Sequence, residues 1–120
     1  MIIVKCDSDL DKVTNPELKI VIRDSLAELI SVIEVDGDKY DPEEDGYNAI
    51  IENKEDLDKV DEIGLEKDDL RFQEYVNDIS TSKGEYKEFL ILWNNDGGVV
   101  LYMTTELYNE MNMGELNDNN

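Results

Sequence analysis

Apolar residues recur at helical spacing in one long stretch of the N-terminal third. The stripe is formed by Leu18, Ile22, Leu26, Leu29, Ile30 and Ile33. Just before it, Asn15 has the side chain of a helix N-cap, Pro16 suits the first helical position, and Glu17 places an acid in the first turn. The pattern therefore predicts a helix from residue 15 to about residue 33.

Short runs of β-branched and aromatic residues predict four strands. They cover residues 2–5, 47–52, 85–93 and 99–103, and the polar segment 7–14 reads as a loop. Between the last two strands stands Asn94-Asn95-Asp96-Gly97-Gly98. Asp-Gly between apolar runs is a strong hairpin signal, because glycine accepts the positive φ that such turns require. We therefore expect a β-hairpin near the C-terminus.

Three shorter helices are expected between and after these strands. One covers 53–63 and ends at Gly64, the next covers 65–80, and the last begins at Thr104 or Thr105 and runs through Met111. The apolar positions of the first are Leu57, Val60 and Ile63, and those of the second are Leu70, Phe72, Tyr75, Val76 and Ile79.

The order of these elements predicts one α+β domain. No internal repeat is visible, and no linker rich in Pro, Gly or Ser divides the chain. We expect a single domain over residues 1–113, in which a small antiparallel sheet with a C-terminal β-hairpin is covered by helices packed on one face. Residues 114–120 are expected to form a polar C-terminal tail.

The charge of the chain is its most unusual property. The 120 residues include 31 acidic and 11 basic ones, so the net charge is −20, yet 40% of the residues are hydrophobic. That apolar content predicts a folded domain with a very negative surface rather than a disordered acidic chain. Such a surface repels nucleic acid and anionic membranes and attracts cations and basic proteins.

The residue types make catalysis unexpected. The chain has no histidine, so the commonest general base and zinc ligand is missing, and Ser-His or Cys-His arrangements are excluded. Gly97 and Gly98 fall in a hairpin rather than before a helix, so no phosphate-cradling loop is predicted. Cys6 is the only cysteine, and we expect it to be packed at a strand end. We therefore predict a non-enzymatic protein without a cofactor.

The cysteine count and the length of the apolar stretches predict the cellular compartment and the absence of a membrane span. A single cysteine excludes an internal disulfide and fits a reducing compartment. No stretch approaches the roughly 18 to 20 apolar residues of a membrane span. The expected location is therefore cytoplasmic.

One acidic stretch resembles the calcium-binding loop of an EF-hand. Asp41, Glu43, Asp45, Gly46 and Glu52 occupy loop positions one, three, five, six and twelve. Against a metal site, Glu43 is longer than the usual ligand, and Asn48 stands where paired loops carry an aliphatic residue. In addition, the segment 47–51 reads as strand instead of helix. The prediction is an acidic turn that binds no specific metal.

The acidic residues concentrate between Asp36 and Asp69. This segment holds 15 acids and 4 lysines, a net charge of −11. A small domain needs a net charge of only about 2 to 8 for solubility. The additional negative charge therefore favours the hypothesis that these acids bind a partner. Tyr86, Phe89, Trp93 and Tyr102 lie on the predicted hairpin and are expected in the sheet core. The alternative is that an exposed Tyr or Trp, with Trp93 as the candidate, anchors a partner. The predicted partner-binding residues are Asp41, Glu43, Glu44, Asp45, Glu52, Glu55, Asp56, Asp58, Asp61, Glu62, Glu66, Asp68, Asp69 and Trp93.

These features favour an inhibitor that binds a basic, nucleic-acid-binding partner protein by nucleic-acid mimicry or steric blocking. In size and charge the chain is similar to small phage-encoded anti-CRISPR and anti-restriction proteins, and to immunity proteins that neutralise nuclease toxins. Two other hypotheses stay open: a regulatory subunit whose acidity serves only solubility, and a small-ligand or cation-binding module. Direct binding to nucleic acid or membrane is not expected.

Overall fold

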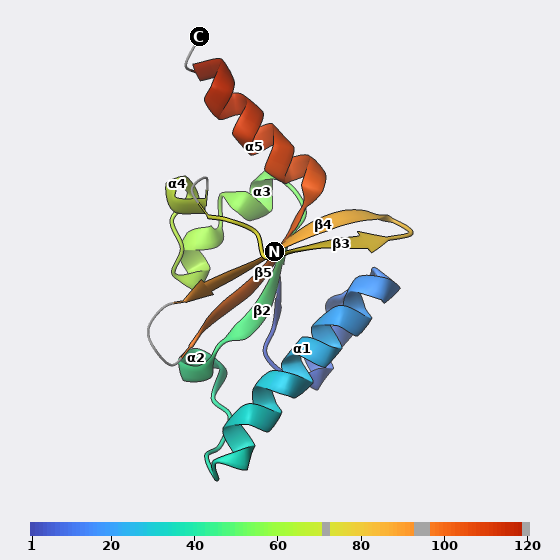
Figure 1. Cartoon of the computed structure of the whole chain (residues 1–120), viewed down its shortest axis with the longest axis vertical. Coiled ribbons are helices and arrows are strands. Elements are labelled where there is room, and N and C mark those ends of the chain that lie inside the picture. Colours follow the sequence, from blue (N-terminus) through green and yellow to red (C-terminus); the bar gives the residue numbers. More distant parts are fainter. Residues whose placement is uncertain (71–72, 93–96, 119–120) are drawn as a thin grey trace.

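A five-stranded mixed sheet forms the centre of the protein (Figure 1). The computed structural model describes residues 1–70, 73–92 and 97–118, of which 112–118 are described by their backbone. The strand order is β1-β2-β5-β4-β3. The strands are β1 (Ile2–Val4), β2 (Tyr47–Ile51), β3 (Asn77–Thr81), β4 (Gly84–Leu92) and β5 (Gly98–Thr104).

The strand pairing confirms the α+β class and corrects one detail. β3, β4 and β5 form an antiparallel meander that contains the predicted hairpin, and β1 pairs antiparallel with β2. The prediction of a wholly antiparallel sheet is wrong, because β2 and β5 run parallel, with Ala49 opposite Leu101. A long connection over 52–97 returns the chain to the end of the sheet where β2 begins, which is what a parallel pair requires.

Helices cover both faces of the sheet, so the prediction of a single covered face is also wrong. The α1 face is covered by η1 (Asp7–Lys12) and α1 (Pro16–Val35). The α5 face is covered by α3 (Lys54–Leu57), η2 (Val60–Ile63), α4 (Lys67–Leu70) and α5 (Thr105–Asp118). The physical reason lies in the central strands: Ala49, Ile50 and Ile51 are consecutive apolar residues, and alternate residues of a strand point to opposite faces.

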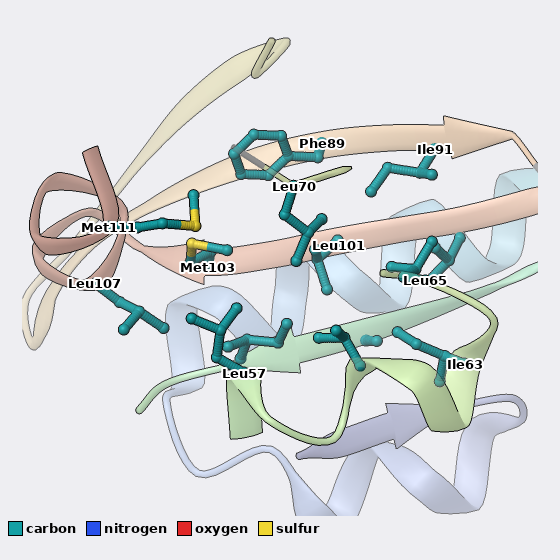
Figure 2. Close-up of a cluster of buried hydrophobic side chains, with 14 of the residues drawn as sticks. Leu57, Ile63, Leu65, Leu70, Phe89, Ile91, Leu101, Met103, Leu107 and Met111 are labelled. Carbon is teal, nitrogen blue, oxygen red and sulfur yellow. The ribbon is translucent and has the colours of Figure 1, made fainter. Parts of the chain in front are cut away.

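Two buried clusters hold the layers together. On the α5 face, apolar side chains of β2, β4 and β5 meet those of the short helices and α5; Figure 2 shows Leu57, Ile63, Leu70, Phe89, Leu101 and Met111 among them. On the α1 face, Leu18, Ile22 and Leu26 of α1 pack against Ile50, Tyr86 and Tyr102. The prediction that Tyr86, Phe89 and Tyr102 are core residues is confirmed.

The long helix begins as predicted. The Asn15 side chain accepts hydrogen bonds from the backbone N–H groups of Glu17 and Leu18, each at 3.2 Å. Its predicted stripe supplies the three buried residues of α1. The segment 7–14, predicted as a loop, contains the 3-10 helix η1, and the predicted helix 53–63 is divided into α3 and η2. Gly64 ends the second piece with a φ of 78°.

The predicted helix 65–80 is wrong. Among the described residues of this range, only those of α4 are helical, and strand β3 follows, which extends the sheet beyond β4. β-branched Ile79 and Thr81 suit the pleated strand, and Ile79 packs against the α1-face cluster. Tertiary pairing with β4 therefore outweighs the helical spacing of Leu70, Tyr75 and Ile79. Phe72 lies outside the described residues.

The last helix is longer than predicted. Thr104 Oγ1 accepts a hydrogen bond from Leu107 N at 3.2 Å, which caps the helix, and α5 continues to Asp118. It projects from one end of the sheet (Figure 1). None of the helices in the described part of the chain is both long and apolar enough to cross a membrane.

Candidate acidic binding surface

The fold divides the predicted acidic segment into three groups. β2 runs through the middle of the segment and separates the turn that carries α2 (Pro42–Asp45) from the helices that follow β2. The second group lies at the end of β2, around α3. The third group lies on η2 and α4. The segment is therefore a set of neighbouring surfaces rather than one continuous helix face.

Most acids of the first group form hydrogen bonds or an ion pair within the protein. Asp41 caps α2, because its Oδ1 accepts from the Glu43 N–H at 3.1 Å. Asp45 Oδ2 accepts from the Asp41 N–H at 2.8 Å. Glu43 pairs with the ammonium of Lys5, and this hydrogen bond raises the pKa of Lys5. Glu44 is the exposed acid of this turn that takes no part in such contacts.

The resemblance to a calcium loop does not extend to its geometry. Asp41 and Asp45 lie at the start of β2, whereas Glu52 follows the last residue of that strand. Five extended residues therefore separate the first ligand positions from the twelfth, a span of about 16 Å. Glu52 instead accepts a hydrogen bond from the hydroxyl of Tyr86 at 3.1 Å.

The second group forms a pocket together with the last helix. We call this the α3–α5 pocket; its volume is about 550 Å³. Its lining residues are Glu52, Asn53, Lys54, Glu55, Thr104, Glu106, Leu107 and Glu110. Four glutamates and a single lysine thus line one concave surface, and the lining carries a net charge of −3.

The parallel pairing of β2 with β5 creates this pocket. Ile51 lies opposite Met103 at the ends of the two strands. Because the strands run in the same direction, the segments that follow them leave the sheet side by side. Glu52 and Glu55 come from the first segment, and Glu106 and Glu110 come from the second, one helical turn apart on α5.

The hydroxyl of Tyr86 borders the same carboxylates. Burial raises the pKa of Tyr86, and the nearby Glu52 carboxylate raises it further. The hydroxyl therefore stays protonated at neutral pH and remains a donor to Glu52. This contact links Glu52, which follows β2, to Tyr86 of β4, a member of the buried cluster on the α1 face.

Asp56, one of the predicted partner-binding residues, makes contacts within the protein. Its side chain is buried; one oxygen pairs with the amino group of Met1, and the other accepts from the Glu52 N–H at 3.0 Å. A buried carboxylate needs such partners, because an unpaired charge is costly away from water. Asp56 therefore ties the N-terminus to the end of β2 instead of facing solvent.

The third group is exposed and largely free of internal ion pairs. Asp58 pairs with Lys67, with 2.7 Å between its Oδ1 and the ammonium nitrogen. Within the described parts of the chain, nine of the predicted acids are exposed and make no ion pair. They are Asp41, Glu44, Glu52, Glu55, Asp61, Glu62, Glu66, Asp68 and Asp69.

Two further predictions concern residues away from these groups. Cys6 was expected to be packed, but it is exposed, because the chain turns outward after β1 to begin η1. Its Sγ lies 3.0 Å from the hydroxyl of Ser8. Trp93, the predicted aromatic anchor, lies outside the described residues.

Sequence reasoning missed Glu106 and Glu110. Their spacing of four residues is visible in the sequence, but nothing in the sequence places the last helix beside α3. The pocket they complete can accept hydrogen bonds from guanidinium or ammonium groups, because ionised carboxylates are acceptors only. Comparisons with protein-family models, with curated proteins and with solved structures find no match to this chain.

Proposed function

We propose that the protein is a non-enzymatic inhibitor that binds a basic, nucleic-acid-binding partner protein through its acidic surface. The observation that carries the proposal is the α3–α5 pocket, whose lining brings four glutamates from two distant segments together with one lysine. Like charges gathered in this way repel one another, and only a cationic partner offsets that repulsion. Exposed acids on α2, η2 and α4 add further negative charge to the surface of the protein.

The overall charge density supports mimicry of nucleic acid. The longest dimension of the protein is 54 Å, so a net charge of −20 corresponds to about one charge per 2.7 Å. Duplex DNA carries about one charge per 1.7 Å of helix axis. The two densities are close enough for the protein to compete for a cleft built to hold phosphates. Electrostatic steering would speed that encounter and make it dependent on salt.

Competition on the captured partner tests the proposal. The immobilised protein is used to capture a partner from lysate at roughly 50 mM and 200 mM salt, and we expect weaker capture at the higher salt concentration. After the partner has been purified, duplex nucleic acid should displace it from the protein, and the protein should displace nucleic acid in return. A partner that binds both at once with unchanged affinities would contradict the proposal.

A matched pair of variants separates the α3–α5 pocket from general acidity. The pocket variant changes Glu52, Glu55, Glu106 and Glu110 to Gln. The control combines Glu28→Gln, Glu34→Gln, Asp38→Asn and Glu74→Gln, which removes the same charge from exposed positions outside the pocket. We expect the pocket variant to lose at least about tenfold more affinity for the partner than the control does. Equal losses would show that only net charge matters.

A further inference from the structure

A second concave site lies between the η2–α4 segment and the end of β4. We call it the α4–β4 cleft; its volume is about 460 Å³. Its lining residues are Gly64, Leu65, Glu66, Asp69, Leu70, Gln73, Ile91 and Leu92. It differs from the α3–α5 pocket because four of its eight lining residues are large and apolar and its two acidic residues come from one short segment.

The floor of the cleft is part of the core on the α5 face. Leu65, Leu70 and Ile91 are buried and belong to that cluster (Figure 2). Leu92, the last residue of β4, is 66% exposed at the edge of the cleft. A large apolar side chain exposed at the edge of a concave site is typical of contact surfaces.

The acidic side of the cleft is formed by Glu66 and Asp69. Glu66 and Asp69 are three residues apart, so their side chains project from neighbouring positions on the α4 turn. Both are exposed, and neither forms an ion pair with another described residue. Lys67 lies between them in sequence, but its ammonium is engaged by Asp58 at 2.7 Å. The cleft therefore combines apolar side chains with two acidic residues that form no ion pair with another residue that the structure describes.

This combination has the chemistry of a site for one long basic side chain. The methylene stem of such a side chain covers apolar surface while its charged end remains at the polar edge. Guanidinium fits two carboxylates better than an ammonium does, because its planar group presents several fixed N–H donors. The amide oxygen of half-buried Gln73 offers one more acceptor at the same edge.

We propose that the α4–β4 cleft receives a single arginine side chain of the partner protein. The inference rests on the proposed function for the basic character of that partner. The arginine stem lies against Leu65, Leu70 and Ile91, and its guanidinium meets Glu66 and Asp69. Exposed Leu92 then contacts apolar surface beside the arginine. The cleft provides position and register, whereas the remaining acidic surface provides long-range attraction.

A peptide titration tests the cleft without the partner. The blocked tripeptide Gly-Arg-Gly is added to the intact, ¹⁵N-labelled protein, and the same tripeptide with citrulline in place of arginine serves as the uncharged isostere. We expect saturable shifts of the backbone amide signals of Leu65, Asp69 and Leu92 with arginine and none with citrulline. Shifts that are equally large in the α3–α5 pocket, or that spread evenly over all acids, would overturn the proposal.

Paired variants identify the two carboxylates. Glu66→Gln with Asp69→Asn should weaken binding of the arginine peptide by about fivefold, since two partly exposed charge contacts are lost. Glu74→Gln with Asp38→Asn makes the same chemical changes outside the cleft and should weaken binding less than about twofold. The spectra of the free variants verify folding. Equal losses would refute an arginine site here, whereas failure of nucleic acid to compete with the partner would refute the proposed function instead.

Discussion

The backbones of Gly46 and Gly98 are in direct contact. A Cβ atom on Gly46 would lie 2.1 Å from the carbonyl oxygen of Gly98, and a Cβ atom on Gly97 would lie 2.0 Å from the carbonyl oxygen of Glu44. The hydroxyl of Tyr40 donates to the carbonyl oxygen of Gly46 at 2.6 Å. This junction fixes the acidic turn of α2 to the start of β5. Glycine is therefore required at positions 97 and 98 because the backbones approach each other closely there. The sequence pattern instead predicted positive φ as the reason.

Substitution at this junction should be far more damaging than substitution at an open glycine. Gly37 and Gly46 both have positive φ, 85° and 108°, but a Cβ on Gly37 would meet nothing within 4 Å. We expect Gly37→Ala to cost about 1–2 kcal/mol of unfolding free energy, the cost of the left-handed backbone alone. Gly46→Ala should cost at least about 2 kcal/mol more, because backbone must move. Urea midpoints measure both, and equal midpoints would refute the close contact.

Both sheet faces should contribute comparably to stability. Leu26 is fully buried on the α1 face and Ile91 is 8% exposed on the α5 face. We expect Leu26→Ala and Ile91→Ala each to lower the free energy of unfolding by about 2–5 kcal/mol, as buried large-to-small changes do. Denaturant unfolding provides the measurement, and a midpoint near that of the wild type for either variant would contradict the two-cluster core.

The control for these core variants is Glu28→Ala. Glu28 is exposed on the same helix as Leu26, so its replacement should stay within about 0.5 kcal/mol of the wild type. Lys87 is unsuitable although it lies on β4 near Ile91. Its side chain is only 12% exposed, its ammonium lies 4.0 Å from the ring centre of Tyr75, and it pairs with Asp78.

The contact between α1 and the β3–β4 turn should depend on pH. Both carboxylate oxygens of Glu17 accept from the Ser82 N–H, at 2.9 and 3.0 Å, and one also accepts from the Ser82 hydroxyl. These bonds lower the pKa of Glu17 below its ordinary value of 4.5. A lowered folded-state pKa means that the stabilisation is complete above pH 4.5 and disappears as the pH falls through the folded-state value.

Comparison with Glu17→Gln isolates this contribution. We expect the stability difference between the wild type and Glu17→Gln to be constant at neutral pH and to shrink below pH 4.5. Glu28→Gln, at an exposed position on the same helix, serves as the control. A difference that persists unchanged into strong acid would mean that the Glu17 charge is not what holds Ser82.

Calcium should bind only diffusely. We expect weak binding that is shared with magnesium and suppressed by salt, because exposed carboxylates attract divalent cations without a fixed ligand set. Isothermal titration calorimetry with both cations at two salt concentrations tests this. A single site of micromolar affinity that Glu52→Gln abolishes would restore the calcium-loop hypothesis for residues 41–52.

Local signals in the sequence predicted local structure well. Asn15, Pro16 and Glu17 determine a helix start through contacts within a few residues, and the alternation around Phe89 identifies a strand by itself. The prediction of a helix for the segment that contains Ile79 is wrong, because its strand pairing depends on β4, which follows it in the chain. The same limit applies to the candidate site. Glu52 and Glu55 stood out by local charge, but their proximity to Glu106 follows only from the parallel pairing of β2 with β5.

The parallel pair also affects how the chain reaches this structure. β2 has β1 on one side as soon as the N-terminal segment is made, but two strands alone are marginally stable in water. Its other neighbour, β5, follows only after the connection over 52–97, and contacts of such high sequence separation slow folding. Before β5 pairs with β2, the apolar stripe of α1 lacks most of the sheet surface against which it packs. A net charge of −20 also opposes association between partly folded chains, because like-charged chains repel one another.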